Sequence, residues 1–266
     1  MVYLELNIGV DVGYGYVKAV SSEGKRVIFP SLVAPARELV LADLSLNGRR
    51  HLNDLAASVS VNGADPIWVQ FSRVLVYPQG AGSLFAVSNL PDSGMIGIVD
   101  VGYKTTDYLT VEIKNKKALP VSGLSGSVEI GVYYLYKAVA EEYERATGGI
   151  LNVAKAEQVV RNGKTFYRGR EIDMTGAVAR ARFEVARAIA DNVLAALGSS
   201  ADEVRKVYLG GGGILELEEL SELLPATEVL PEPQWANALG FLKICESWAM
   251  RNGLATVPVS DGNSLA

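Results

Sequence analysis

One short segment near the start of the chain combines an aspartate, two glycines and a lysine in a pattern that suits phosphate chemistry. Residues 11–14 read Asp-Val-Gly-Tyr, Gly15 follows, and Lys18 stands seven residues after Asp11. Glycine-containing turns expose backbone N–H groups at close range, which suits phosphate oxygens. The lysine ammonium can neutralise a phosphate charge, and an aspartate suits magnesium, which keeps several waters and few direct carboxylates. The segment indicates a metal–polyphosphate site, with a plain hairpin turn as the alternative.

The same tetrapeptide recurs at residues 100–103. Both copies lie between apolar stretches whose alternation predicts β-strands, so each is a strand–turn–strand junction. A repeat in the same local context indicates two related halves, each with an acidic, glycine-lined hairpin. We therefore expect an α/β fold with two similar domains, mixed sheets flanked by helices, around a nucleotide cleft. Asp11 and Asp100 would face each other across that cleft.

Composition excludes several classes of protein. The 266 residues suit one large or two modest domains, and 49% hydrophobic content is incompatible with a largely disordered chain. No apolar stretch is long enough for a membrane span, and the first residues lack the pattern of a secretory signal. A single cysteine and a single histidine leave no internal disulfide and no zinc cluster, which favours the cytoplasm. The net charge of −5 argues against direct nucleic-acid binding.

Periodicity and turn residues predict the remaining elements. Strands are expected over 25–32, over 59–77 around a turn at 62–63, and over 207–209. A hairpin is expected over 159–172, with its turn at Asn162-Gly163. Helices are expected over 49–58, 132–147, 175–197 with Thr175 as N-cap, and 236–250.

Two other phosphate-binding motifs are excluded by counting. The dinucleotide fingerprint G-x-G-x-x-G needs a glycine where Lys18 stands, and a helix rather than a strand after it. Residues 163–165 read Gly-Lys-Thr, like the end of a Walker A loop, but Gln158 occupies the position of the required first glycine. We interpret residues 163–165 as a polar hairpin turn.

The order of the motifs resembles that of the actin-like ATPases, within the superfamily of actin, heat-shock chaperone ATPase domains and sugar kinases. The similarity is greatest to ParM-type and archaeal actin-like proteins. Residues 11–18 and 100–107 resemble the two phosphate motifs, 77–82 and 235–240 the two connecting segments, and 209–213 the adenosine motif. These five segments stand in the family's order along the chain.

The resemblance implies roles for individual residues. Gln79 would orient the attacking water, Asp100 would be catalytic, and Asp11 and Asp100 would hold Mg²⁺ through water. Asp107 is weighed as a second contact of that water or as a plain strand-end carboxylate, and Gly131 as a minor contributor through its helix end. Nucleotide contacts are expected from Asp11, Gly13, Tyr14, Gly15, Tyr16, Lys18, Gly102, Tyr103, Lys104, Thr105, Gly210, Gly211 and Gly212.

The resemblance also implies a function and a division into domains. The first domain would comprise residues 1–93 with 240–266, and the second residues 94–239. Only about sixty residues separate Lys18 from Gln79, so the outer lobe of the first domain is either minimal or lacks a loop. The hypothesis is a cytoplasmic, Mg²⁺-dependent hydrolase of ATP (or GTP) whose domain closure controls filament assembly, as in plasmid segregation through a DNA-binding adaptor. The alternatives are a small-molecule kinase and a nucleotide-gated interaction module that does not polymerise.

Overall fold

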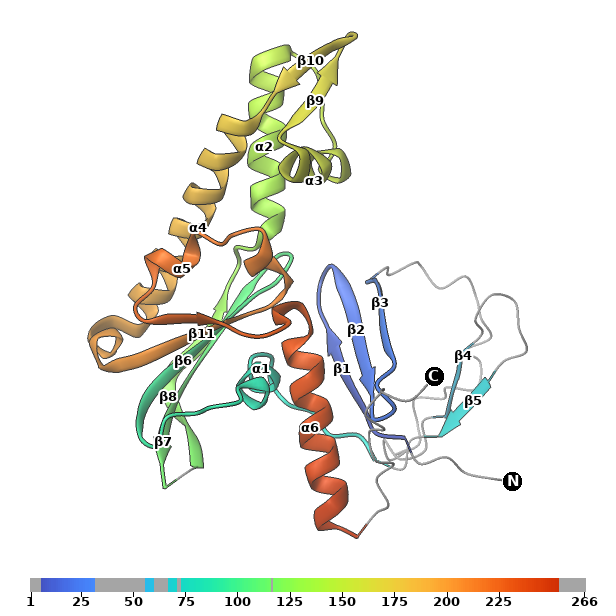
Figure 1. The fold of residues 1–266 in the computed structure, drawn as a ribbon, viewed down its shortest axis with the longest axis vertical. Helices are drawn as coiled ribbons and strands as arrows, with labels where there is room; N and C mark the ends of the chain where they lie inside the picture. Colours follow the sequence, from blue (N-terminus) through green and yellow to red (C-terminus); the bar gives the residue numbers. More distant parts are fainter. Residues whose placement is uncertain (1–5, 32–55, 60–66, 71–72, 116, 254–266) are drawn as a thin grey trace, which may run out of the picture. The chain divides into compact units, whose positions relative to one another are not determined.

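The computed structural model describes residues 6–31, 56–59, 67–70, 73–115 and 117–253. The chain divides into two compact units, Met1–Ser31 with Pro78–Ala266, and Leu32–Tyr77 (Figure 1). The domain boundaries expected from the sequence stay a prediction. Within the described ranges, none of the helices has the length and apolar character needed to cross a lipid bilayer.

The smaller unit contains one antiparallel pair of strands, β4 (Ala56–Val59) and β5 (Ile67–Gln70), with Val59 opposite Ile67. Of the strands predicted over 59–77, the pairing confirms Val59 and Ile67–Gln70, whereas residues 73–77 are not in a strand, and the turn predicted at 62–63 lies outside the described residues. The helix predicted over 49–58 is wrong for residues 56–58, which belong to β4, while 49–55 lie outside the described residues. Pairing with β5 thus overrides the expected local preference of residues 56–58.

The larger unit begins with a three-stranded antiparallel sheet made of β1 (Ile8–Val12), β2 (Tyr16–Ser21) and β3 (Arg26–Pro30). Side chains of β1 alternate in burial, as a half-covered strand requires: Asp11 is buried while Val10 and Val12 are exposed. The buried face contacts α6 (Ala236–Arg251), so this helix fixes which side of β1 points inward.

The second sheet is mixed and has five strands in the order β12-β11-β6-β7-β8. Its central strand β6 (Gly94–Val101) runs parallel to β11 (Val204–Gly210), which in turn is parallel to β12 (Thr227–Val229). On its other side β6 pairs antiparallel with β7 (Thr106–Lys114), and β7 with β8 (Lys117–Val128). The fold class predicted from the sequence, α/β with mixed sheets flanked by helices, is confirmed.

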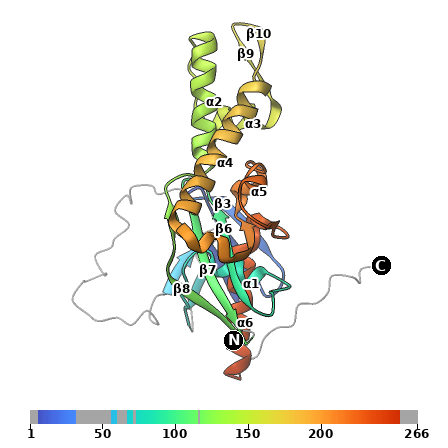
Figure 2. The same cartoon turned by 90° about the vertical axis from the view of Figure 1, so that its left-hand side faces the viewer.

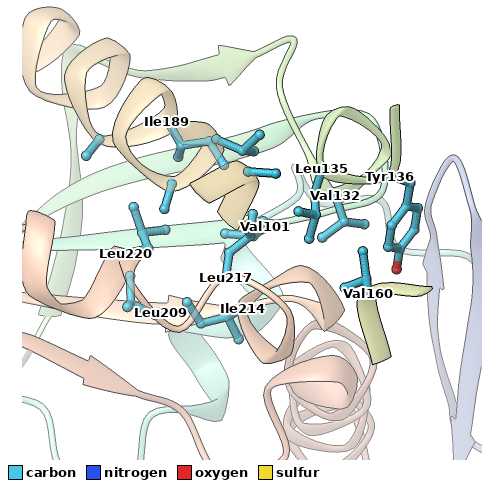
Figure 3. Close-up of a cluster of buried hydrophobic side chains, with 14 of the residues drawn as sticks. Val101, Val132, Leu135, Tyr136, Val160, Ile189, Leu209, Ile214, Leu217 and Leu220 are labelled. Atoms are coloured by element: carbon cyan, nitrogen blue, oxygen red, sulfur yellow. The ribbon is translucent and has the colours of Figure 1, made fainter. Parts of the chain in front are cut away.

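Strand β6 is buried on both faces, and its two faces meet different helices. Ile96 and Ile98 pack in a cluster with Leu84 of the short helix α1 (Ala81–Ala86). Val101 points to the opposite face, into a large core cluster (Figure 3), and Val99 belongs to the same cluster. Helix α1 in turn contacts α6, so these two helices lie between the first and the second sheet.

Helices cover the outer face of the second sheet. The large cluster joins that face to α2 (Val132–Thr147), α3 (Val153–Asn162), α4 (Thr175–Leu197) and α5 (Leu220–Leu223). Both views show a small hairpin, β9 (Lys164–Tyr167) with β10 (Arg170–Asp173), beside the ends of α2 and α4 that lie away from the sheet (Figures 1 and 2). Short 3₁₀ helices, η3 (Gly198–Glu203), η4 (Gly212–Leu215) and η5 (Pro233–Trp235), connect the last elements.

The hairpin predicted over 159–172 is wrong in its first half. Residues up to Asn162 belong to α3, whose first turn is capped by the Asn152 side chain accepting from the Lys155 N–H at 2.9 Å. Gly163 ends that helix in the left-handed conformation (φ 70°), and the true hairpin turn follows at Arg168-Gly169. Asn-Gly served as a helix end here, a role open to the same residue types as a hairpin turn.

The long helix predicted over 175–197 has the expected ends but not the expected cap. Thr175 is its first helical residue, and the N-cap position is held by Met174. The Asp173 carboxylate accepts from the Thr175 N–H at 2.9 Å, and this hydrogen bond lowers the pKa of Asp173. A carboxylate at the start of a helix is stabilised by the free N–H groups there, so Asp173 supplies what Thr175 was expected to supply.

Candidate functional site

The first acidic hairpin places an aspartate and a lysine directly opposite each other. Asp11 on β1 pairs in register with Lys18 on β2, and the turn between them is closed by a hydrogen bond from the Gly13 N–H to the Tyr16 carbonyl at 3.2 Å. The Lys18 ammonium lies 3.0 Å from Asp11 Oδ2. Both side chains are largely buried, with 13% and 8% of their surface exposed. Such a shielded ion pair fixes the position of both charges.

The second acidic hairpin repeats this arrangement on the other sheet. Asp100 on β6 pairs in register with Asp107 on β7, and the Gly102 N–H donates to the Thr105 carbonyl at 2.8 Å. The aspartate therefore stands at the same place before the turn in both hairpins, but its cross-strand partner is a carboxylate rather than a lysine. The repeated tetrapeptide marks a repeated local structure.

The two turns line one cavity of about 370 Å³. They also approach each other closely, because a Cβ atom on Gly15 would lie 2.8 Å from Cβ of Tyr103. Of the residues predicted for the site, the cavity is lined by Asp11, Gly13, Tyr14, Gly15, Tyr16, Lys18, Gln79, Asp100, Gly102, Tyr103, Thr105 and Gly212. The structure thus brings the greater part of the predicted set together.

Asp100 is a buried carboxylate of the cavity, and its pKa is strongly raised. It is 7% exposed, and burial, followed by the nearby charge of Asp11, raises its pKa to about 7. The Ser83 hydroxyl donates to its Oδ2 at 2.9 Å and the Asn237 amide at 3.0 Å, and the Ser83 hydrogen bond opposes that rise. Burial also raises the pKa of Asp107, which lines the same cavity. A cation between these carboxylates would offset the repulsion between them.

Gln79 reaches the cavity from the segment that precedes α1. Its Nε2 donates to the Val12 carbonyl at 3.1 Å, which ties it to the end of β1. Gly80 follows in the left-handed region (φ 83°) and turns the chain into α1. With one Nε2 hydrogen bound to Val12, the side-chain carbonyl oxygen and the second Nε2 hydrogen remain for a water molecule.

Three of the residues predicted to contact the nucleotide, Lys104, Gly210 and Gly211, do not line the cavity. The Lys104 ammonium lies 6.0 Å from the ring centroid of Tyr133. A Cβ atom on Gly210 would lie 2.9 Å from Ser83 Oγ, and one on Gly211 would overlap the backbone of Val101. The absence of side chains at both glycines serves packing between protein elements, whereas Gly212 faces the cavity.

The first N–H groups of α2 are hydrogen-bonded to other parts of the protein. The N–H groups of Val132 and Tyr133 donate to the carbonyls of Gly102 and Tyr103 at 3.3 and 2.8 Å. A Cβ atom on Gly131 would lie 2.6 Å from the Gly102 carbonyl oxygen. The positive end of α2 therefore stabilises the second turn, and the minor ligand role weighed for Gly131 stays a prediction.

Sequence reasoning missed one wall of the cavity. Tyr136 of α2, Glu157 and Arg161 of α3, Glu216 after η4, and Gln234 of η5 line it. Arg161 is paired with Glu157 at 2.7 Å and with Glu216 at 3.5 Å. No local motif marks these residues, since they come from four separate elements. The tyrosines within residues 132–136 could mark a ligand surface, but their helical spacing is equally typical of packing.

Among the described residues, no cluster of three or more histidine, cysteine, aspartate or glutamate side chains is arranged to hold a metal directly. Helix α4 carries several arginines. One of them, Arg182, stands behind the cavity wall, where it pairs with Glu216 at 3.4 Å.

Two acidic hairpins in the same register lie on two sheets around one cavity, which is the arrangement expected from the resemblance to actin-like ATPases. Two family models match the chain: the C-terminal domain of the MreB-like archaeal actin homologues over residues 98–222, and the N-terminal domain of actin-like proteins over residues 9–65. The chain is similar to actin-like proteins over these two segments and has the actin-like ATPase fold.

Individual relatives agree with this assignment. An archaeal actin homolog of Thermoplasma acidophilum is 28% identical over 203 residues, which cover 71% of this chain and 60% of that protein. Solved structures with a fold similar to that of this chain include an archaeal actin homolog in complex with ADP (TM-score 0.74, 21% identity, 91% of this chain and 100% of that chain). They also include a 15-stranded ParM filament from Clostridium botulinum (TM-score 0.74, 20% identity, 92% and 100%). The chain thus spans less than two thirds of the length of the Thermoplasma protein.

Proposed function

We propose that the chain binds a magnesium nucleoside triphosphate in this cavity and hydrolyses it. The observation that carries the proposal is the convergence of the two acidic hairpins on one cavity, with Lys18 beside Asp11. The ADP complex of a solved structure with the same fold supports the choice of ligand. Of the two candidate substrates, ATP is preferred and GTP is the alternative.

The phosphates would lie between the two turns. Their residues 13–16 and 102–105 present glycine-containing backbone to the cavity, and Lys18 supplies the positive charge. Gly212 offers a surface without a side chain to the rest of the nucleotide. Binding of a polyphosphate by backbone N–H groups and one lysine is common in nucleotide-binding proteins.

The donor set fits magnesium held through water. Asp11 and Asp100 both line the cavity and are almost fully buried, and the charge of Asp11 helps to raise the pKa of Asp100, an effect that a bound cation would oppose. Magnesium prefers oxygen ligands, keeps several of its waters and takes few protein carboxylates. When bound, the ion would neutralise charge on the phosphate oxygens.

Gln79 is the residue proposed to position the attacking water. It lies at the cavity, is anchored through Nε2 to Val12, and has a carbonyl oxygen left to accept from a water molecule. Glutamine serves to orient water in other nucleotide hydrolases. Asp100 remains the proposed catalytic carboxylate.

Nucleotide-dependent self-association completes the proposal. The two lobes, residues 1–93 with 240–266 and residues 94–239, would close around the triphosphate and reopen after hydrolysis, a transition driven by differential binding. A repeating head-to-tail contact then gives an open polymer. The similarity to a ParM filament supports this reading. A cytoplasmic role in plasmid segregation through a DNA-binding adaptor is the most specific form of the proposal.

The test is phosphate release with Mg-ATP and with Mg-GTP, together with electron microscopy of the same samples. The wild type should release phosphate without any added alcohol, and Asp100→Ala should abolish release while keeping the fold. Asp191→Ala is the matched control, because Asp191 lies exposed on α4. Normal turnover in Asp100→Ala would overturn the site, and strict dependence on an alcohol would assign a kinase instead.

A further inference from the structure

Two buried polar side chains next to the cavity have no role in the function proposed so far. Ser83 on α1 is 0% exposed and Asn237 on α6 is 4% exposed, and both lie where these helices meet Asp100 on β6. Burying a polar group costs free energy unless it finds hydrogen-bond partners. Alanine and leucine would fill these two positions without that cost. The presence of serine and asparagine there therefore suggests that their hydrogen bonds serve the site.

The hydrogen bonds give the Asn237 amide one orientation. Its Oδ1 accepts from the backbone N–H of Ser83 at 3.0 Å, and that N–H can only donate. The Nδ2 group must therefore face Asp100, where it donates to Oδ2 at 3.0 Å. The Ser83 hydroxyl donates to the same Oδ2 at 2.9 Å. Two donors from two helices thus converge on a single oxygen of the carboxylate.

Three glycines clear the space for this arrangement. A Cβ atom on Gly82 of α1 would lie 2.7 Å from Cα of Asn237, and one on Gly240 of α6 would overlap the Gly82 carbonyl. A Cβ atom on Gly210 of β11 would lie 2.9 Å from Ser83 Oγ. Close approach of three separate elements is therefore built into the sequence at this point.

We propose that Ser83 and Asn237 are positioning residues for Asp100, an inference that rests on the proposed hydrolysis. By holding Oδ2 on the protein side, they keep the other carboxylate oxygen turned to the cavity that Asp100 lines. Without them the buried carboxylate would be free to rotate about its side-chain bonds. Binding of the nucleotide, which relies on the two turns and Lys18, would change little.

The hydrogen bonds of Ser83 and Asn237 also link Asp100 to the two segments that precede α1 and α6. Gln79 comes two residues before α1, and Gln234 two residues before α6, and both line the cavity. A shift of either helix relative to β6 would therefore move a cavity residue and the Asp100 carboxylate together. This gives domain closure a direct effect on the proposed catalytic group.

The test compares Ser83→Ala and Asn237→Leu with Leu242→Ala in phosphate release with Mg-ATP, ADP affinity and free energy of unfolding. Leu242 is a matched control because it is buried in α6 but packs against Val20 instead of Asp100. Loss of a hydrogen bond to a charged group corresponds to roughly a tenfold change or more. Each network variant should therefore lose about tenfold in kcat, while its Kd for ADP stays within about threefold of the wild type.

The outcomes separate the two proposals. Unchanged kcat in both network variants, beside an active wild type, would overturn the positioning role alone. An equal loss of kcat in Leu242→Ala would also overturn it, since general destabilisation would then explain the effect. A wild type that releases no phosphate would overturn the proposed hydrolysis and the positioning role with it. Two independent network variants keep the test decisive if one of them fails to fold.

Discussion

Replacing the buried Asp100 by asparagine should change how the stability of the protein depends on pH. Burial and the charge of Asp11 raise the pKa of Asp100 from 3.8 to about 7 in the folded chain. A group whose pKa rises on folding contributes stability below its unfolded pKa, and that contribution is lost as the pH rises through the folded value. Asp100→Asn keeps the shape and an acceptor for Ser83 and Asn237 but has no proton to lose.

The size of the effect follows from the two pKa values. Each pH unit between them corresponds to about 1.4 kcal/mol, so the full contribution is about 4 kcal/mol. Between pH 5 and pH 8, where urea unfolding is practical, about 2 to 3 kcal/mol of it should be lost. The wild type should therefore lose stability relative to Asp100→Asn by this amount over that range, with EDTA present throughout.

Urea unfolding followed by circular dichroism at four pH values measures the difference directly. Asp92→Asn is the matched control, because Asp92 is an exposed aspartate of the same unit. A difference between wild type and Asp100→Asn that stays constant from pH 5 to pH 8 would refute the reasoning. It would mean that Asp100 titrates alike in the folded and unfolded chain.

Three further predictions concern the cavity and its support. Gly240→Ala should cost about 2 kcal/mol or more of unfolding free energy, because its Cβ would overlap the Gly82 carbonyl; a stability equal to the wild type in urea would contradict this contact. Lys18→Met should weaken ADP binding at least about tenfold in calorimetry through loss of a charge-assisted contact, and unchanged affinity would place the phosphates elsewhere. Gln79→Leu should lower kcat for phosphate release by about a hundredfold with little change in ADP affinity; equal loss of both would make Gln79 a binding residue.

The parts of the site that could be predicted are those formed by neighbours in the sequence. Asp11 and Lys18 are opposite each other because a short turn joins their strands, so their spacing alone determines the pairing. The repeated tetrapeptide then pointed to a second hairpin of the same kind. The fold followed from the order of these motifs rather than from any single one.

The parts that could not be predicted depend on contacts between distant segments. Arg161 and Glu216 meet at the cavity although fifty-five positions separate them, and neither lies in a recognisable motif. Ser83 and Asn237 are joined only by the packing of α1 on α6. Gly210 belongs to a glycine run that predicts a ligand surface. In the structure this residue makes room for the side chain of Ser83, a distant contact that the sequence does not reveal.

Local signals also fail where one residue pair suits two structures. Asn162-Gly163 fits a hairpin turn and a helix end equally well, and only the Asn152 cap and the packing of α3 decide between them. The helix expected over 49–58 is likewise wrong at residues 56–58, which pair with β5. In both cases tertiary context overrode the propensity of the segment.

The most direct test of the central claim is a crystal structure of the protein with Mg²⁺ and a non-hydrolysable ATP analogue. The account predicts the phosphates between turns 13–16 and 102–105, with the Lys18 ammonium on a phosphate oxygen and a hydrated metal ion facing Asp11 and Asp100. A nucleotide bound outside this cavity, or phosphates with no contact to either turn, would contradict it.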